Sequence, residues 1–584
     1  MTPTDSVARR KGARAAEWDG LENRCGCMPT VGSNPTPSAI FLDTRDGGIS
    51  LNKSERHSVI ERYLVALGAL GDITVNGRTV REMTQIGLHD FWTASSMRES
   101  SLWQDHAVDE QLKNLTSHQT PNVMIQRVGW VRGRAIFAWL RSLFDAFQVR
   151  RAGSVNRNID KADIIFVQYW PTQVMKVAAT SQSRWESAYF RNLPRHLTEA
   201  GLSVRFLHLH ADGRVTRAPA SVRKQIRDAN TPVRQHLLLT DFLSFSVWLR
   251  AIVAWLRVQR RWLMQRIETA VPPEGDLGRL WPRWKPLLQR SIVGSHAVRT
   301  ALLTEMFAQV LRNNRGTKVW VTAFEGQGWE SCLARVLDHH DAVWVPYLHT
   351  MMRPWDLRAH TFLAEQPPKR LALHGPHDKS ELQTTIGIAA RRPSHQSTEV
   401  IDVEALRYQH LNAPASESHQ PDGATAKEAT WLVVGGADCE LSSRELQAFV
   451  SVTRAQSVRA KIVVRWHPQC QLPEWVDRSE ITVSQEPLGV LALRSNAALM
   501  VGLAAPLDTY LAGVPSCSFV AQSGLAMSPI EENEYHHLAL DAADAVRWMQ
   551  KFEGSVHFVA DAERFFNFGE DLTRWRDLIF SLAR

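Results

Sequence analysis

Short apolar runs alternate with amphipathic segments between residues 431 and 520. The runs have the length of buried strands and cover residues 431–434, 461–465, 481–483, 498–501 and 514–520. The segments between them carry helical patterns with start and stop signals, such as Ser442 before one helix and Gly513 after another. Strands that alternate with helices predict a parallel sheet, whose ligands bind beyond the carboxyl ends of the strands. This stretch therefore predicts a doubly wound α/β domain.

Polar residues and glycines fall at the predicted strand ends of this domain. They are Gly435, Gly436, His467, Glu486 and Asp508. Because the carboxyl ends of parallel strands share one edge of the sheet, we expect these residues to lie along one ligand crevice.

The same alternation occurs earlier in the chain. Strand patterns at residues 163–167, 203–208, 318–322, 342–347 and 370–373 predict a second parallel sheet. Glu325 and Gly326 follow the third of these strands, and His349, Arg353 and Arg358 lie beyond the fourth. A polar segment without regular pattern, residues 412–428, is the predicted interdomain linker. The predicted fold class is α/β, with two Rossmann-like domains facing a cleft, at residues 151–411 and 429–584.

Two helical patterns combine aromatic residues with arginines. In the first, residues 134–151, one side carries Ile136, Trp139, Leu140, Leu143, Phe144 and Phe147, which by itself is typical of a core helix. In the second, residues 242–266, the apolar face carries Trp248, Leu249, Ile252, Trp255, Leu256, Trp262 and Leu263. Its other face carries Arg250, Arg257, Arg260 and Arg261. This second pattern favours a helix in the headgroup layer of an anionic leaflet, and a helix packed on the protein with a solvated basic face is the alternative.

These helices belong to two predicted additions to the α/β domains. One is a helical N-terminal region at residues 46–150, and the other is an amphipathic helical insertion at residues 242–290. A chain of 584 residues is long enough for two domains with such additions.

Composition describes a globular protein, with 44% hydrophobic and 22% charged residues. The sequence has no run of apolar residues long enough for a membrane span. The net charge of +8 is compatible with nucleic acid, an anionic membrane face or an anionic substrate. The six cysteines lack the spacing of a metal site, and their scatter predicts reduced thiols.

The first 45 residues lack the periodicity of a folded segment. The peptide at residues 31–39 resembles the T-arm of a tRNA gene translated as a reading frame, so we expect that the start codon is placed too far upstream. An ordinary tail without function is the alternative. In both cases residues 1–45 are expected to carry no function.

Motifs in both domains support a family resemblance. Glu325-Gly326, His467-Pro468 and the helix beginning near Asp508 together resemble GT-B glycosyltransferases that use CMP-activated sugars, such as bacterial sialyltransferases and capsule Kdo transferases. The wider runs at residues 325–330, 347–350, 355–358, 404–408 and 507–515 resemble surface-carbohydrate (O-antigen or lipopolysaccharide) biosynthesis proteins. The resemblance covers roughly residues 55 to 560.

This resemblance implies roles for the strand-end residues. Glu325 would be the base on the acceptor hydroxyl, and Gly326 would let substrate approach the backbone; a carboxylate that satisfies helix-start amides is the alternative for Glu325. His467 would donate to the nucleotide phosphate, with Pro468 fixing the turn and Arg465 adding charge. The remaining expected nucleotide contacts are the amides of Gly435 and Gly436, and Asp508, which is first of all a helix cap.

One departure from the family pattern affects the phosphate site. The sialyltransferases usually place a serine pair before the last helix, where this chain has Ala504 and Ala505. The phosphate would then be held by backbone amides and Thr509.

His349, Arg353 and Arg358 would hold an anionic acceptor, with a solvated loop as the alternative. No Asp-X-Asp pair is present, so the prediction is inverting transfer without a metal and without another cofactor.

Three functions compete at this point. The first is transfer of a sugar from a nucleotide donor to a cell-surface glycan or glycolipid, by a cytoplasmic protein peripheral to the inner membrane. The second is a CDP-alcohol phosphotransferase of the teichoic-acid type. The third is a binding protein that uses the fold as a scaffold, but the arginines cluster on tryptophan-bearing helices without a nucleic-acid module, so no nucleic acid is expected.

Overall fold

The computed structural model describes most of the chain. The described residues are 53–94, 128–151, 162–170, 174–178, 183–210, 216–230, 235–263, 275–340, 342–353, 356–391, 397–411, 429–436, 438–467, 470–502, 506–520, 528–554 and 558–583. The predicted structureless start, the predicted linker and Pro468 lie outside these ranges.

The first domain is built on a parallel sheet, as predicted. Its strands are β5 (Ile164–Trp170), β8 (Val204–His210), β9 (His236–Leu238), β10 (Val319–Ala323), β11 (Val343–Leu348), β12 (Arg370–Leu373) and β13 (Glu399–Asp402). They lie in the order β13-β12-β11-β10-β5-β8-β9, and all neighbours are parallel. The strand order reverses between β5 and β10, since later strands are added on one side of this pair and earlier ones on the other. This position is the switch point where doubly wound sheets bind ligands.

The second domain repeats this topology. Its strands are β14 (Ala429–Gly435), β15 (Ala460–Arg465), β16 (Ile481–Val483), β17 (Ala497–Val501), β18 (Ser516–Phe519) and β19 (His536–Ala539). They lie in the order β16-β15-β14-β17-β18-β19, again all parallel, so the switch point falls between β14 and β17. Its helices are α14 (Cys439–Ala455), α15 (Leu488–Leu493), α16 (Leu507–Leu511) and α17 (Ala542–Met549). The predicted α/β class with two Rossmann-like domains is confirmed.

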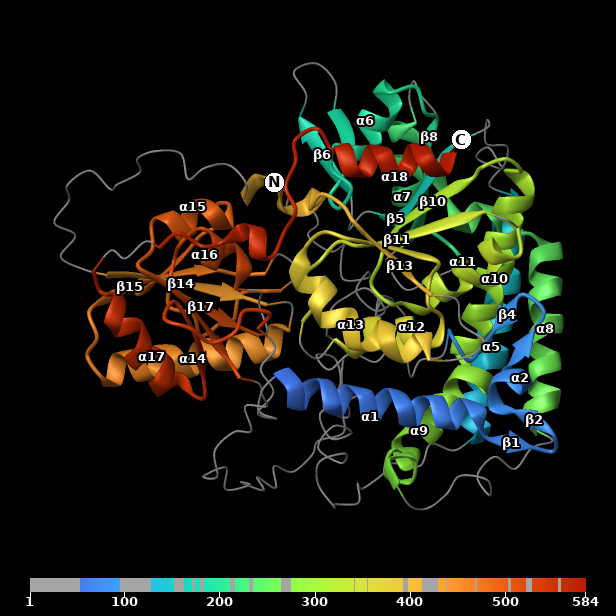
Figure 1. Cartoon of the computed structure of the whole chain (residues 1–584), viewed down its shortest axis with the longest axis horizontal. Coiled ribbons are helices and arrows are strands. Elements are labelled where there is room, and N and C mark those ends of the chain that lie inside the picture. The colour runs from blue at the N-terminus through green and yellow to red at the C-terminus, as the bar shows by residue number, and fades with distance from the viewer. Residues whose placement is uncertain are drawn as a thin grey trace, which may run out of the picture.

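Helices from both predicted additions pack on one face of the first sheet and share its core. They are α1 (Lys53–Asp72), α2 (Val80–Thr84), α5 (Val128–Arg151), α8 (Phe245–Leu263) and α9 (Gly275–Val293). The same core includes α10 (Ser295–Asn313), which begins after the predicted insertion at residues 242–290. An ion pair of 2.7 Å between Arg56 and Glu381 connects α1 to α13 (Pro376–Ala390). Figure 1 shows α1 below the first sheet and α8 on the outer flank of this domain.

The rest of the first domain consists of sheet-covering helices and small hairpins. The helices are α6 (Leu193–Glu199), α7 (Ala220–Ala229), α11 (Gly328–Asp338), α12 (Leu357–Glu365) and α13 (Pro376–Ala390). The hairpins pair β1 (Thr74–Val75) with β2 (Arg78–Thr79), β3 (Gln85–Ile86) with β4 (His89–Asp90), and β6 (Val174–Ala178) with β7 (Ser183–Ser187). Short one-turn segments include η1 (Leu239–Phe242) and η3 (Leu406–Leu411).

The last helix corrects a predicted domain boundary. Although residues 429–584 were assigned to the second domain, α18 (Thr573–Ala583) packs on the first (Figure 1). Trp575 is fully buried against Tyr347, at 5.0 Å between ring centroids. The Glu404 carboxylate accepts the backbone N–H groups of Arg574 and Trp575 at 2.8 and 3.1 Å, which compensates the positive end of α18.

The predicted faces of α5 and α8 are also corrected. In α5, Trp139 is buried, but Ile136, Leu140, Phe144 and Phe147 are exposed, so the predicted core face lies largely in solvent. In α8 the buried residues include Val247, Ala251, Trp255 and Val258, whereas Leu249 and Leu256 are exposed. The reason is that α8 packs against both α5 and α10, so the side chains that face these two helices are the buried ones. None of the described helices is long and apolar enough to cross a membrane.

A disulfide joins two loops of the second domain, contrary to the predicted reduced thiols. It links Cys439, at the start of α14, to Cys470, three residues after His467. Gly436, at the end of β14, lies beside it, because its carbonyl oxygen is 3.7 Å from the Cys470 sulfur. The bond therefore connects the loops that follow β14 and β15.

Candidate functional site

Glu325 lies at the switch point of the first sheet. The buried strand β10 ends at Ala323, and Glu325 follows two residues later with 24% of its side chain exposed. The helix-start role considered for Glu325 belongs instead to Glu330, whose carboxylate accepts the backbone N–H groups of Gln327 at 2.6 Å and of Glu325 at 3.1 Å. The Glu325 carboxylate is thus left for other contacts, among them a hydrogen bond from the Gln327 amide.

The surroundings of Glu325 make its carboxylate a better base. Burial raises the pKa of Glu325, while the positive charges of Arg358 and Arg407 partly oppose this shift. Burial also raises the pKa of Glu330, to well above its ordinary value. A carboxylate with a raised pKa binds a proton more strongly, which is what general-base catalysis needs.

His349 is a buried neighbour of Glu325, not part of a solvated loop. Its Nε2 atom lies 3.6 Å from Oε1 of Glu325, and its ring stacks on Tyr189 at 4.0 Å between centroids. Burial lowers the pKa of His349 to well below its ordinary value, and Arg407 lowers it further. His349 is therefore neutral at physiological pH. The sequence suggested that it holds an anionic acceptor, but a neutral ring cannot do so by charge.

The other predicted acceptor residues have mainly structural contacts. Arg358, in the first turn of α12, pairs with Asp356 at 3.3 Å. Gly326 has a φ of +68°, and an added Cβ would lie 2.8 Å from the Arg358 carbonyl group. The glycine thus permits close approach of α12, where the sequence suggested approach of a substrate. Arg353 lies half-buried in the loop between β11 and α12.

Arg407 is a member of this site that the sequence interpretation did not select. Its guanidinium carbon lies 5.8 Å from the ring centre of Tyr189 and 5.6 Å from that of Tyr408. Burial opposes its charge, but Tyr408, Tyr189, Asp508 and Glu325 together raise the pKa of Arg407. Arg407 therefore links the charges of both domains. Arg407 lies in the run 404–408 that resembles surface-carbohydrate proteins, so the sequence could have indicated it. No sequence motif indicated Tyr189.

The predicted glycines of the second domain serve packing. An added Cβ on Gly435 would lie 2.8 Å from the Trp466 ring, and the Gly436 N–H donates to the Val501 carbonyl at 2.8 Å. The Gly436 amide is thus used within the sheet and is not open to a phosphate.

At the same switch point the Gly502 N–H donates to Glu445 at 2.7 Å, and burial raises the pKa of Glu445 to about 7.

Arg465 and His467 lie at the end of β15, as predicted. The Arg465 guanidinium donates to the carbonyl oxygens of Glu486 and Trp466, at 3.1 and 2.9 Å, so it holds the loop after β16 in place. His467 is half-buried, and burial together with Arg465 lowers its pKa. It is therefore neutral at physiological pH and suited to a hydrogen bond with a ligand rather than an ion pair.

Asp508 and Thr509 differ from their predicted roles. Pro506, and not Asp508, is the N-cap of α16, and the Asp508 charge acts on Arg407 of the first domain. Thr509 is fully buried and its hydroxyl donates to the Pro506 carbonyl at 2.7 Å, so it cannot hold a phosphate.

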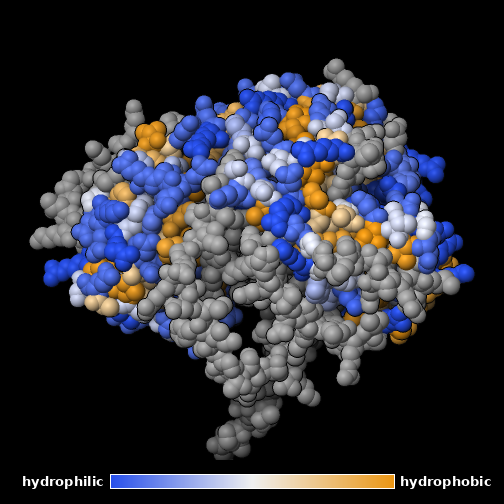
Figure 2. Space-filling model, turned by 60° about the horizontal axis from the view of Figure 1, so that its bottom comes forward, coloured by the Kyte–Doolittle hydropathy of each residue, from blue (hydrophilic) through white to orange (hydrophobic). Residues whose placement is uncertain are grey.

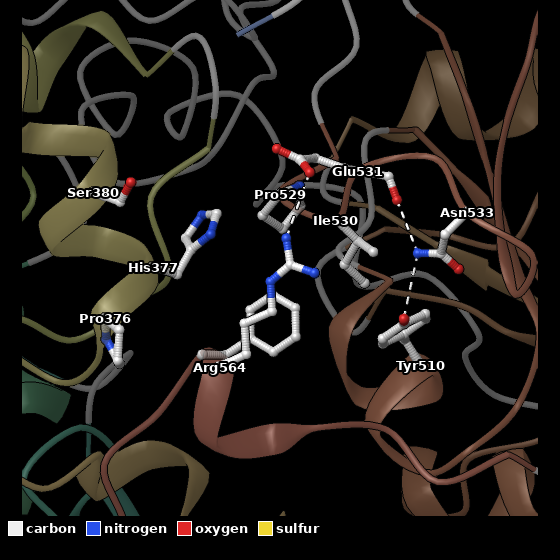
Figure 3. A pocket seen from close by; sticks show the side chains of 10 residues that line it. Pro376, His377, Ser380, Tyr510, Pro529, Ile530, Glu531, Asn533 and Arg564 are labelled. Carbon is white, nitrogen blue, oxygen red and sulfur yellow. Dashed lines mark hydrogen bonds and ion pairs between the residues drawn. The ribbon is translucent and has the colours of Figure 1, made fainter.

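The two domains meet in an apolar contact and a cavity. Met351, Ala405 and Tyr408 of the first domain pack with Leu507 and Ile530 of the second. Beside this contact, a cavity of about 230 Å³ is lined by Pro376, His377, Ser380, Tyr510, Pro529, Ile530, Glu531, Asn533, Arg564 and Phe565. Figure 3 shows His377 and Ser380 on the α13 side, Tyr510 and Asn533 opposite, and Arg564 between them. The predicted arrangement of facing domains agrees with these contacts.

Within the part of the chain that the structure describes, no group of three or more histidine, cysteine, aspartate or glutamate residues is arranged to hold a metal ion.

Comparisons with known proteins gave only distant structural likenesses. No family model matches the chain, and no curated protein matches it. Among solved structures, it is similar to UDP-GlcNAc 2-epimerase from Methanocaldococcus jannaschii (9% identity, 71% of this chain and 99% of that chain, TM-score 0.39). It is also similar to the lipopolysaccharide outer core galactosyltransferase WaaB (9%, 72% and 99%, 0.35) and to the calicheamicin glycosyltransferase CalG4 (10%, 73% and 96%, 0.34). At these scores the fold class rests on the strand order of this chain itself.

Proposed function

We propose that this protein is a glycosyltransferase that moves a sugar from a nucleotide donor to an acceptor hydroxyl, with Glu325 as the base. The observation that carries the proposal is the position of Glu325. Its carboxylate lies at the switch point of one Rossmann-like sheet, with a raised pKa, and its charge and that of Asp508 of the other domain both act on Arg407.

The proposed reaction has a simple balance. Glu325 accepts the proton of the acceptor hydroxyl while the hydroxyl oxygen forms a bond to the anomeric carbon of the donor. The bond between that carbon and the phosphate oxygen breaks, and the nucleoside phosphate leaves with the electron pair. In this proposal Arg407 stabilises the charge that develops on this phosphate, and the neutral His467 donates a hydrogen bond to it.

The finer features of the proposal come from the motif resemblance. They are a CMP-activated donor, inverting and metal-independent transfer, and a cell-surface polysaccharide or lipid-linked acceptor. The Glu325-Gly326 and His467 positions at strand ends support this donor class, because they match the order of the motifs in the two domains. A cytoplasmic location peripheral to the inner membrane completes the proposal, and exposed apolar helices support it.

The first experiment is a screen of CMP-, CDP-, UDP- and GDP-sugars for thermal stabilisation, since a ligand that binds the native state raises the melting temperature by mass action. We expect a CMP-sugar to give the largest increase. The stabilising donor is then incubated with acceptor glycans and the products are analysed. A product that carries the sugar without phosphate supports glycosyl transfer, whereas phosphate that stays on the acceptor indicates a phosphotransferase, since a CMP-sugar and a CDP-alcohol both release CMP. No stabilisation by any nucleotide contradicts the proposal.

A further inference from the structure

Two neighbouring helices present a continuous row of exposed apolar side chains. Those on α5 are Ile136, Phe137, Leu140, Phe144 and Phe147, and those on α8 are Phe245, Leu249, Val253 and Leu256. Their exposed fractions range from 37% to 64%. We name this set the α5–α8 surface. The two rows adjoin, because the rings of Phe147 and Phe245 lie 6.3 Å apart and Trp248 donates to Ser142 of α5 at 3.0 Å.

The α5–α8 surface stands on a firmly packed base. Trp139 of α5 is buried against Trp255 of α8, at 5.8 Å between ring centroids, and Ala251 and Val258 are fully buried beneath them. The exposed side chains are therefore held in fixed positions. Scattered apolar residues are normal on a protein surface, but a contiguous group of this size marks a site that binds a membrane or another protein. In Figure 2, apolar surface appears on the right-hand flank, the side on which Figure 1 places α8.

The charges around this surface favour anionic lipid. The sequence of α8 contains four arginines and no acidic residue. Arg250 pairs with Glu305, and Arg261 donates to the Gln85 carbonyl, but Arg257 and Arg260 are exposed.

The acidic side chain of α5 does not alter this balance. The sequence of that helix contains one acid, Asp145, which is buried and accepts a hydrogen bond from Thr216 at 2.6 Å. The flank of exposed apolar and basic groups therefore lacks a compensating acid from either helix. A second copy docked here would bring like charges together, whereas anionic headgroups would neutralise them.

We infer that the α5–α8 surface docks on an anionic bilayer, with its apolar side chains at the headgroup boundary and Arg257 and Arg260 on lipid phosphates. This inference deepens the membrane location in the proposed function and moves the contact from the tryptophan face of one helix to the outer faces of two. It does not depend on which nucleotide the cleft binds.

Sedimentation with vesicles tests the inference. The full chain is spun with vesicles of phosphatidylcholine alone and with vesicles of equal parts phosphatidylcholine and phosphatidylglycerol, and stronger binding to the second is expected. The double variant Phe144→Ser, Leu249→Ser removes two large exposed apolar groups, so the bound-to-free ratio should fall roughly 10- to 100-fold. The matched control, Leu493→Ser with Leu540→Ser, removes exposed leucines of the second domain and should bind like the parent.

A second variant tests the charges. Arg257→Glu with Arg260→Glu should weaken binding to phosphatidylglycerol vesicles by roughly 10-fold or more and leave the weak binding to phosphatidylcholine unchanged. Equal binding of both double variants and the parent would overturn the inference. So would a dimer of the lipid-free parent that Phe144→Ser with Leu249→Ser dissociates, since a second copy would then cover the surface.

The donor screen keeps the two proposals separate. Both double variants should show the same nucleotide-induced increase in melting temperature as the parent, because the α5–α8 surface shares no residue with the Glu325 site. If vesicles bind and no nucleotide stabilises any form, the glycosyltransferase proposal fails and the membrane inference stands.

Discussion

Nε2 of His349 lies 3.6 Å from Oε1 of Glu325, although 24 positions separate the two residues in the chain. The cause is the register of the sheet. Ala323 at the end of β10 pairs with Tyr347 of β11, and two residues further along each chain this same register places Glu325 opposite His349. Parallel pairing thus brings the proposed base and a neutral imidazole together at the switch point of the first sheet.

The raised pKa of Glu325 predicts the acid limb of the pH–rate profile. A base works only when it is unprotonated, so kcat/KM should fall, as pH decreases, at a pH above the ordinary glutamate value of 4.5. Arg358→Met removes a positive charge that lowers the pKa of Glu325, so the variant should need a higher pH for the same rate. Arg370→Met, which breaks an exposed pair with Glu399, is the control. An acid limb that does not move in Arg358→Met contradicts this electrostatic account.

Glu325 and His467 should separate catalysis from donor binding. Glu325→Gln keeps the side-chain shape but cannot accept a proton, so transfer should fall roughly 10²-fold or more while nucleotide affinity stays the same. His467→Ala should weaken nucleotide binding by about 1–3 kcal/mol, since it removes one hydrogen bond to a charged group. Calorimetric titration and initial rates measure the two effects. The opposite pattern would mean that the roles of the two domains are reversed.

Arg407 should matter more than its half-buried position suggests. Arg407→Met keeps an unbranched apolar side chain but removes the guanidinium that lies over Tyr189 and Tyr408 and the charge that acts on Asp508 and Glu325. We expect roughly a 10²- to 10³-fold loss of kcat, because a charge on the leaving phosphate is no longer stabilised. A parallel measurement on Arg454→Met, which breaks the exposed pair with Glu480, gives the effect of losing an arginine far from the site. Full activity of Arg407→Met would remove this residue from the mechanism.

Glu445 should make stability depend on pH. Its pKa is raised from 4.5 to about 7 in the folded protein, so the folded state binds more protons than the unfolded state between these values. The contribution to stability is complete below pH 4.5 and is lost as pH rises through 7.

Glu445→Gln tests this dependence. The amide keeps an acceptor for the Gly502 N–H and does not titrate, so the loss of unfolding free energy between pH 5 and pH 8 should shrink by about 1–2 kcal/mol, given that the side chain is only partly buried. Urea unfolding at both pH values provides the measurement, with the exposed Glu440→Gln of the same helix as control. Identical pH dependence in parent and Glu445→Gln would argue against this source.

The sequence by itself determined the strands, the fold class and the position of the candidate base. Runs such as residues 319–321 and 431–434 are apolar throughout because parallel strands are covered on both faces, and this makes them recognisable without any tertiary information. Two such series, each alternating with helices, imply two parallel sheets. Glu325 and His467 then follow from chain connectivity, since each comes directly after a strand.

Tertiary structure decided which side chains serve the site and which serve packing. Thr509 and Gly436 look available in the sequence, but one is buried in α16 and the other is bonded to Val501. Arg407 and Tyr189 meet only because segments far apart in the chain converge, and α18 returns to the first domain because Trp575 is buried there. The helical period of α5 and α8 shows which residues share a face, but it does not show which face is buried. Only the neighbouring elements in space decide that.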